Sequence, residues 1–174
     1  MSPGSPDAAE VLAALRRRGL TLASAESLTG GLVGAALTAV PGSSDVYRGG
    51  VVCYATDLKA TLAGVPAVLL EAYGPVAPQT AAALATGVAQ ACGADVGVAT
   101  TGVAGPSAQD GHPVGEVYVA VSVRGDDEPR VRPLRLAGDR ARIREQSVDA
   151  ALALVLEVLV GDAAAGRGTS PVPG

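Results

Sequence analysis

The chain contains a single lysine, Lys59, beside twelve arginines. The distinction is chemical, because a lysine can lose its proton and act as a base, whereas a guanidinium stays charged in proteins. Lys59 stands five residues after Tyr54, in the stretch VVCYATDLKATL. Scarcity alone is weak evidence, since an Arg- and Ala-rich composition can also leave one lysine by chance. Whether Lys59 is a base or a surface charge left by chance therefore has to be judged from the other reactive groups in the chain.

Ser27 is the candidate nucleophile. It lies in the stretch AESLTGG (25–31), between a predicted strand and a predicted helix. A serine hydroxyl needs a base that takes its proton, and Lys59 could be that base if partial burial lowers its pKa from ~10.4. Tyr54 could relay the proton or donate one to the leaving group. The only histidine, His112, lies in a polar loop and is expected to be solvated, so serine, lysine and tyrosine together predict a hydrolase site without histidine.

Two glycine-rich loops could complete such a site. In the first, Gly30 and Gly31 follow Thr29, so that main-chain N–H groups could face a phosphate or an oxyanion. The alternative is a serine N-cap followed by a turn that glycine makes easy. This loop is neither a Walker loop nor a G-x-S-x-G elbow. The second loop, TTGVAGP (100–106), follows the most apolar predicted strand and either lines the same pocket or is an ordinary turn.

Helix-like and strand-like patterns alternate along the chain and must position these loops. We expect strands at 20–26, 49–55, 95–101, 115–123 and 129–138, and helices at 7–18, from 28 to about 40, around Lys59, at 78–92 and at 139–160. Asp7 would cap the first helix, and an apolar stripe marks the last one (Val148, Leu152, Val155, Leu156 and Leu159). The pattern predicts one α/β domain over 7–160, a three-layer α/β/α sandwich with a mixed sheet, between disordered tails at 1–6 and 161–174.

Composition excludes several classes of function. The net charge of −4 and pI near 4.9 argue against a nucleic-acid partner. A single histidine argues against a His-based zinc site, and Cys53 and Cys92 stand in apolar runs typical of small buried residues. No apolar run approaches the ~20 residues that span a bilayer. The N-terminus lacks the pattern of a signal peptide, so a cytoplasmic protein is expected.

Several motifs occur together in an order that resembles one known family. They are AESLTGG, VPGSS, the Tyr-x4-Lys stretch, TG-x-AGP, PVG and GDR, spread over residues 8–160. The chain thus resembles the C-terminal domain of the competence-damage-inducible protein CinA. Stand-alone members of that family are amidohydrolases that convert nicotinamide mononucleotide to nicotinate mononucleotide and ammonia, without a metal or organic cofactor.

The resemblance implies roles for individual residues. Ser27 would be the nucleophile and Lys59 the general base, with Tyr54 assisting. The substrate would be bound by main-chain donors at one loop, by the other loop and by an arginine (Thr29, Gly30, Gly31, Thr101, Gly102, Gly105 and Arg140). Arg140, in GDR, would meet the substrate phosphate. The implied partner is a small nucleotide, and a homo-oligomer is expected.

Departures from the family pattern leave alternatives open. The family often has cysteine at Leu28, Ser-Asn at Ala55-Thr56, and a lysine where this chain has His112, which could weaken phosphate binding or make it pH-dependent. Any activity of the N-terminal half of CinA is expected to be absent. A catalytically silent binding module on the same fold remains an alternative. A short-chain reductase is excluded, because four residues separate Tyr54 from Lys59 where that site has three, and no G-x-G-x-x-G follows the first strand.

Overall fold

The central sheet has five strands in the order β2-β1-β3-β4-β5. In the computed structural model, which describes residues 8–164, β1 (Leu22–Glu26) pairs in parallel with both β2 (Tyr47–Val52) and β3 (Val96–Gly102). β4 (Glu116–Val123) is antiparallel to β3, and β5 (Arg130–Arg135) is antiparallel to β4. Every residue of β1 is buried, as expected for a central parallel strand. β5 lies at an edge, where Pro133 is tolerated because that position needs no ladder donor on its open side.

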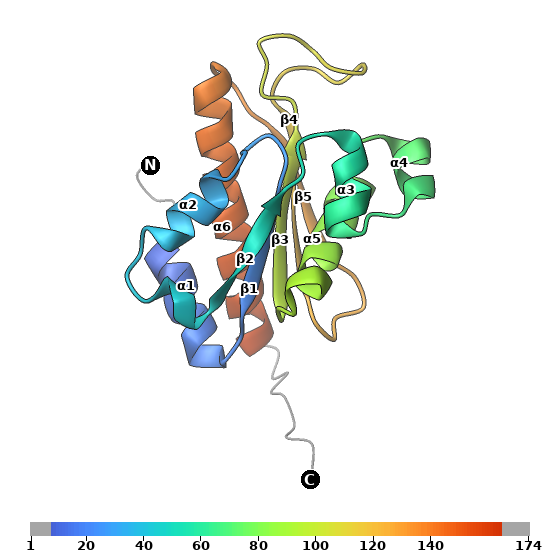
Figure 1. Cartoon of the computed structure of the whole chain (residues 1–174). Helices are drawn as coiled ribbons and strands as arrows, with labels where there is room; N and C mark the ends of the chain where they lie inside the picture. The colour runs from blue at the N-terminus through green and yellow to red at the C-terminus, as the bar shows by residue number, and fades with distance from the viewer. Residues whose placement is uncertain (1–7, 165–174) are drawn as a thin grey trace.

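Helices cover both faces of the sheet (Figure 1). One face carries α1 (Ala8–Arg18), α2 (Leu32–Thr38) and α6 (Arg140–Ala164) over a Leu- and Val-rich core. The other carries α3 (Thr56–Ala63), α4 (Ala67–Tyr73) and α5 (Pro78–Cys92) over a smaller, alanine-rich core. A 3₁₀ turn (Ser43–Asp45) precedes β2. The predicted α/β fold with a mixed sheet between two helical layers is confirmed.

Glycine lets the backbones in the smaller core approach closely. A Cβ atom on Gly87 of α5 would lie 1.6 Å from the carbonyl oxygen of Ala63 in α3. A Cβ on Gly97 of β3 would lie 1.9 Å from the carbonyl oxygen of Ala85 in α5. Both distances are far below van der Waals contact, so only glycine fits at either position. The position of α3, which carries Lys59, therefore depends on direct contact with α5.

Some predicted boundaries are wrong. α2 begins at Leu32 instead of residue 28, because Gly30 (φ 57°) and Gly31 (φ 101°) make residues 27–31 a turn. The sequence analysis missed α4, and β2 begins two residues earlier than predicted. α6 continues to Ala164, so the predicted tail from 161 is helical at its start. Asp7 and the remaining tail residues, 1–6 and 165–174, lie outside the described residues.

The prediction for the cysteines holds for one of them. Cys53 is fully buried. Cys92, the last residue of α5, is only partly buried, because it lies at the end of the helix. Both are free thiols.

Candidate active site

Two neighbouring parallel strands bring Ser27 and Lys59 together. Ser27 is the first residue after β1, and Lys59 lies in the first turn of α3, which begins four residues after the end of β2. Since β1 and β2 are parallel, their carboxyl ends meet at one edge of the sheet. Lys59 Nζ lies 3.0 Å from Ser27 Oγ. The expected meeting of the two side chains, 32 positions apart, is thus present.

The Lys59 amine is buried, with 1% of the residue exposed. Burial lowers the pKa of Lys59, since desolvation penalises the charged form, while the nearby Cys53 opposes this shift weakly. Nζ donates to the carbonyl oxygens of Cys53 (2.8 Å) and Tyr54 (3.2 Å). Within residues 8–164 no carboxylate forms an ion pair with Lys59. A neutral amine has two N–H groups for these carbonyls and one lone pair for the Ser27 hydroxyl.

The buried carboxylate of Glu26 fills the start of α2. Glu26 is 2% exposed, and its two oxygens accept hydrogen bonds from three main-chain N–H groups, those of Gly31 (3.0 Å), Val33 (3.0 Å) and Gly34 (2.8 Å). The hydroxyl of Thr29 donates to the same carboxylate at 2.7 Å. The protein's own carboxylate therefore occupies the place where an anionic ligand would bind to a helix N-terminus.

This arrangement corrects the expectation for the first glycine loop. The N–H of Gly31 is bound to Glu26, and the N–H of Gly30 donates to the carbonyl oxygen of Ser27 at 3.1 Å. Thr29 is fully buried, and its hydroxyl is shared between Glu26 and Thr100. Neither glycine N–H is free for a substrate, because the turn uses both groups for its own structure.

Ser27 and Lys59 line a small cavity of about 80 Å³. The other predicted site residues on its wall are Tyr54, Thr101, Gly102, Gly105 and Arg140, joined by Leu28, Thr56, Pro75, Val76, Ser107 and Gln109. Thr29, Gly30 and Gly31 do not line it. Pockets for whole small molecules usually enclose about 300–1,000 Å³. The cavity therefore has room for a carboxamide, while the rest of a nucleotide would lie beyond it.

Arg140, the first residue of α6, joins two walls of this cavity. Its guanidinium donates to the carbonyl oxygen of Gly105 (2.6 Å) and to the hydroxyl of Tyr54 (3.0 Å). The Tyr54 side chain is largely exposed and is directed at Arg140, while only its main-chain oxygen contacts Lys59. The geometry thus does not support the expected proton relay through Tyr54, because the hydroxyl is held by a cation outside the Ser27–Lys59 pair.

The expectation that His112 is solvated holds only in part, because 29% of its side chain is exposed while its ring is hydrogen-bonded to the protein. Its Nδ1 shares a 3.0 Å hydrogen bond with the buried carboxylate of Glu116, which also accepts from the hydroxyl of Tyr118 at 2.7 Å. These bonds and the nearby Arg135 lower the pKa of Glu116, although burial alone would raise it. His112 also pairs with Gln109 through two main-chain bonds, and it does not line the cavity. It holds the loop that follows the cavity residues.

Two residues of the site were missed from the sequence. Glu26 was given no role, although an acidic residue between a strand and a helix start is a capping signal. Arg144 donates from α6 to the carbonyl oxygens of Leu28 (Nε, 3.0 Å) and Thr29 (2.9 Å). The spacing of Arg140 and Arg144, four residues on one helix, places both on the same helical face and could have identified the second.

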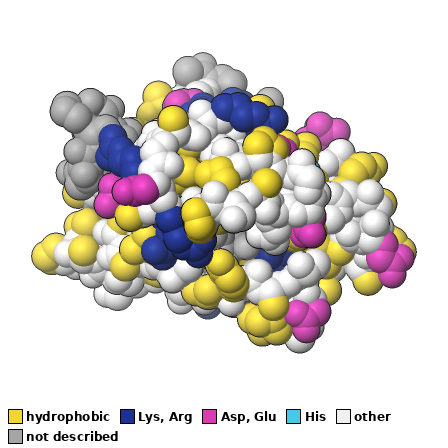
Figure 2. All heavy atoms as spheres, turned by 90° about the horizontal axis from the view of Figure 1, so that it is seen from above, with side chains coloured by type: hydrophobic (Ala, Val, Ile, Leu, Met, Phe, Trp, Pro, Cys, Tyr) yellow, Lys and Arg dark blue, Asp and Glu magenta, His cyan; other side chains and the backbone are white. Residues whose placement is uncertain are grey.

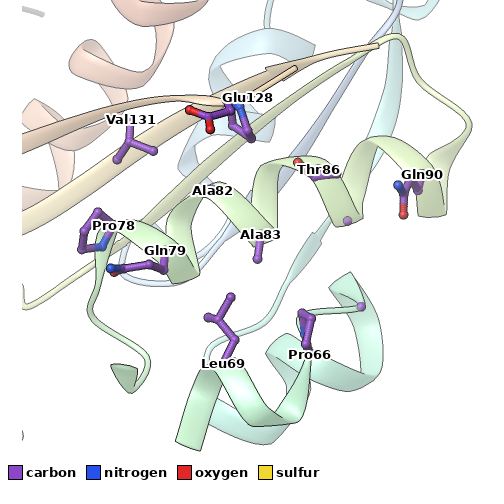
Figure 3. Close-up of a pocket in the computed structure, with 13 residues that line it drawn as sticks. Pro66, Leu69, Pro78, Gln79, Ala82, Ala83, Thr86, Gln90, Glu128 and Val131 are labelled. Atoms are coloured by element: carbon purple, nitrogen blue, oxygen red, sulfur yellow. The ribbon is translucent and has the colours of Figure 1, made fainter. Parts of the chain in front are cut away.

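A larger cavity of about 710 Å³ lies elsewhere and shares no lining residue with the first. Figure 3 shows Pro66 and Leu69 on one side of α5, Glu128 and Val131 on the other, and small side chains of α5 such as Ala83 between them. Its walls hold no serine–lysine pair or other nucleophile with a base. Size alone therefore does not make it the catalytic site.

The surface and the remaining side chains add little further chemistry. Seen from above, the edge of the sheet that carries the site shows basic side chains in separate patches, with acidic groups among them (Figure 2); these are arginines, because Lys59 is buried. In the part of the chain that is described, no three His, Cys, Asp or Glu side chains converge as a metal site would require. Among residues 8–164 no helix has the length and apolarity to cross a membrane.

Comparison with known proteins agrees with the geometry. The profile of the family described as "CinA C-terminal domain" matches residues 5–159. A "CinA-like protein" of Frankia casuarinae is 49% identical over 91% of this chain and 36% of its own length, and a "putative competence-damage inducible protein" of Geobacillus kaustophilus is 47% identical over 88% and 37%. The chain thus spans about a third of the length of these curated relatives.

Solved structures agree over nearly their whole length. A CinA superfamily protein of Klebsiella pneumoniae 700603 superposes with a TM-score of 0.84 at 34% identity, over 88% of this chain and 96% of that one. One from Escherichia coli gives 0.81 at 31% identity, over 91% and 94%. The chain belongs to the CinA C-terminal domain family.

Proposed function

We propose that the protein hydrolyses the carboxamide of nicotinamide mononucleotide to nicotinate mononucleotide and ammonia. The observation that carries the proposal is the buried Lys59 amine, 3.0 Å from the Ser27 hydroxyl and held there by two main-chain carbonyls. Such a pair is an activated nucleophile of the serine–lysine type, which needs neither histidine nor a metal. Membership of the CinA family supports the choice of substrate.

The chemistry follows from the contacts of the amine. Neutral Lys59 takes the proton of Ser27 as Oγ bonds to the amide carbon, and the carbonyl oxygen becomes an oxyanion. The tetrahedral intermediate collapses, the carbon–nitrogen bond breaks, and the proton on Lys59 passes to the departing ammonia. Water then attacks the acyl ester with Lys59 again as base, which releases the acid and restores the Ser27 hydroxyl.

The size of the cavity and the position of Arg140 fit a substrate that lies mostly outside the cavity. A volume of about 80 Å³ accepts the carboxamide and part of a ring. Among residues 8–164, Arg140 is bound only to neutral oxygens, those of Gly105 and Tyr54. A phosphate would give it a charge-assisted hydrogen bond, about twice as strong as a neutral one. Arg140 would therefore exchange these contacts for the phosphate, and Tyr54 would be released from it.

The test measures ammonia released from nicotinamide mononucleotide, its riboside and nicotinamide. We expect turnover of the mononucleotide in the wild type, its loss in Ser27→Ala and Lys59→Met, and no change in Ser44→Ala, which removes an exposed hydroxyl. Full activity in either site variant refutes the mechanism. Calorimetric binding of the mononucleotide without ammonia release identifies a silent binding module instead.

A further inference from the structure

The turn after β1 leaves two main-chain donors unused. The N–H groups of Ser27, Gly30 and Gly31 donate to the carbonyl of Thr100, the carbonyl of Ser27 and the carboxylate of Glu26. The N–H groups of Leu28 and Thr29 have no hydrogen-bond partner within residues 8–164, although both residues are buried. Of the two residues, only Leu28 lines the cavity that holds Ser27 and Lys59. Buried N–H groups are rarely left unpaired, so the N–H of Leu28 beside the nucleophile indicates a ligand oxygen.

Arg144 holds the turn that carries the Leu28 donor. Its guanidinium binds the carbonyl oxygens of Leu28 and Thr29 from α6. The peptide that carries the Leu28 N–H is held at its carbonyl, that of Ser27, which accepts from the N–H of Gly30. In a trans peptide the C=O and N–H groups point in opposite directions, so these bonds fix the peptides on both sides of Leu28 and with them the direction of its N–H. α6 covers one face of the sheet, whereas α3 brings Lys59 to Ser27 from the other.

The contacts of Arg144 are confined to this turn. No carboxylate forms an ion pair with it among residues 8–164, so its charge is directed at main-chain oxygens alone. Glu26 holds the same turn from the amide side, through the hydroxyl of Thr29 and the N–H of Gly31. The turn is therefore held by a cation on its carbonyls and an anion on its amides.

We infer that Arg144 is a positioning residue, which holds the turn at the carbonyls of Leu28 and Thr29 so that the N–H group of Leu28 binds the oxyanion formed at Ser27. The inference rests on the proposed amide hydrolysis. As Ser27 Oγ bonds to the amide carbon, the carbonyl π electrons move to oxygen, and the N–H group of Leu28 donates to that charge. Donors fixed in advance stabilise the transition state more than the bound amide.

The kinetic test compares Arg144→Gln with Arg142→Gln on the same helix, where Arg142 is exposed and contacts Glu145 at the surface. Losing one oxyanion donor outright costs about 10²–10³-fold in kcat. Because Arg144 acts one step away, we expect kcat to fall about 10–100-fold in Arg144→Gln, with KM within about twofold and with Arg142→Gln unchanged. Arg144→Lys, which keeps the charge and one donor, should recover part of kcat.

A second readout does not depend on turnover. Pyridine-3-boronic acid accepts the oxygen of Ser27 at boron while the serine proton passes to Lys59, giving a tetrahedral anion that can be followed by ¹¹B NMR. We expect its affinity to be about tenfold weaker in Arg144→Gln and unchanged in Arg142→Gln.

The outcomes separate the two ideas. Wild-type kcat and boronate affinity in Arg144→Gln, or a change confined to KM, overturns the role of Arg144. If the wild type hydrolyses none of the amides but binds the boronate in an Arg144-dependent way, the proposed function fails and the role of Arg144 stands. Absence of any boronate adduct at Ser27 in the wild type overturns the inference. If Arg144→Gln does not fold, the same comparison is decided with Arg144→Lys.

Discussion

Replacing Gly87 by alanine tests whether contact between α5 and α3 sets the position of the base. The new Cβ would lie 1.6 Å from the carbonyl oxygen of Ala63, and Cβ atoms essentially never approach another atom within 3.0 Å. One helix must move by at least 1.4 Å. Ala63 is one turn beyond Lys59 in α3, so a shift of α3 moves the amine away from its 3.0 Å contact with Ser27. Proton transfer needs about 2.6–3.2 Å.

The expected magnitude follows from that displacement. Misplacement by about 1 Å can cost 10²-fold in rate, so we expect kcat for ammonia release to fall about 10²-fold in Gly87→Ala. Overpacking should also lower the free energy of unfolding by about 1–3 kcal/mol. The measurements are initial-rate ammonia assays and urea denaturation at one pH.

The matched control is Gly161→Ala in α6, where a Cβ meets nothing within 4 Å. Removing a helical glycine without a clash should stabilise the protein by up to about 1 kcal/mol and leave kcat unchanged. If Gly87→Ala behaves like Gly161→Ala in both measurements, the base is not positioned by this contact and the reasoning is refuted.

Four further predictions concern Lys59, Glu26 and Tyr54. Because the pKa of Lys59 is lowered, kcat/KM should rise with pH through a midpoint below 10.5, and an ascending limb centred at or above that value would contradict a buried base. Between the lowered native pKa and 10.5, the unfolded chain binds more protons than the native one. The free energy of unfolding of the wild type should therefore fall as the pH decreases through this window, by at most about 1.4 kcal/mol per pH unit. Lys59→Met should flatten this slope in denaturation curves measured from pH 7 to 10. Glu26→Gln leaves fewer acceptor oxygens for the buried main-chain donors and should lower the free energy of unfolding by about 1–3 kcal/mol. The control is Glu10→Gln on α1, and equal melting temperatures for the two variants would refute the capping role of Glu26. Tyr54→Phe should retain at least about a tenth of wild-type kcat, because the hydroxyl contacts Arg140 and not Lys59. A loss of about 10³-fold would show that the hydroxyl takes part in proton transfer after all.

Much of the fold could be predicted because local signals agree with tertiary structure. Both ends of α5 lie where they were predicted, since proline at its start and Gly93 after its end are strong helix boundaries. The meeting of Ser27 and Lys59 followed from chemistry and from the parallel order of strands. α2 was placed too early, because the apolar spacing begins at Leu28, whereas Gly30 and Gly31 adopt positive φ and delay the helix.

Side-chain directions could not be predicted in the same way. Tyr54 was assigned to the base because it is near Lys59 in sequence, yet its ring turns toward Arg140, a residue 86 positions away. Glu26 could equally have been an exposed acid, and its burial depends on the amides of α2 that surround it. Such choices depend on contacts between distant elements, which periodicity and composition do not encode.

The arrangement of the two buried charged groups explains how lysine can serve as a base here. Glu26 and Lys59 lie on elements next to Ser27, but they form no ion pair within the described residues. An opposite charge within about 4–6 Å would favour the ammonium form and raise the pKa of Lys59. Instead the amides of α2 neutralise the carboxylate, while carbonyls of the β2–α3 loop hold the amine. Because main-chain donors bind Glu26, it does not pair with Lys59. Burial therefore outweighs the opposing effect of Cys53 and lowers the pKa of the amine, whose lone pair is left for Ser27.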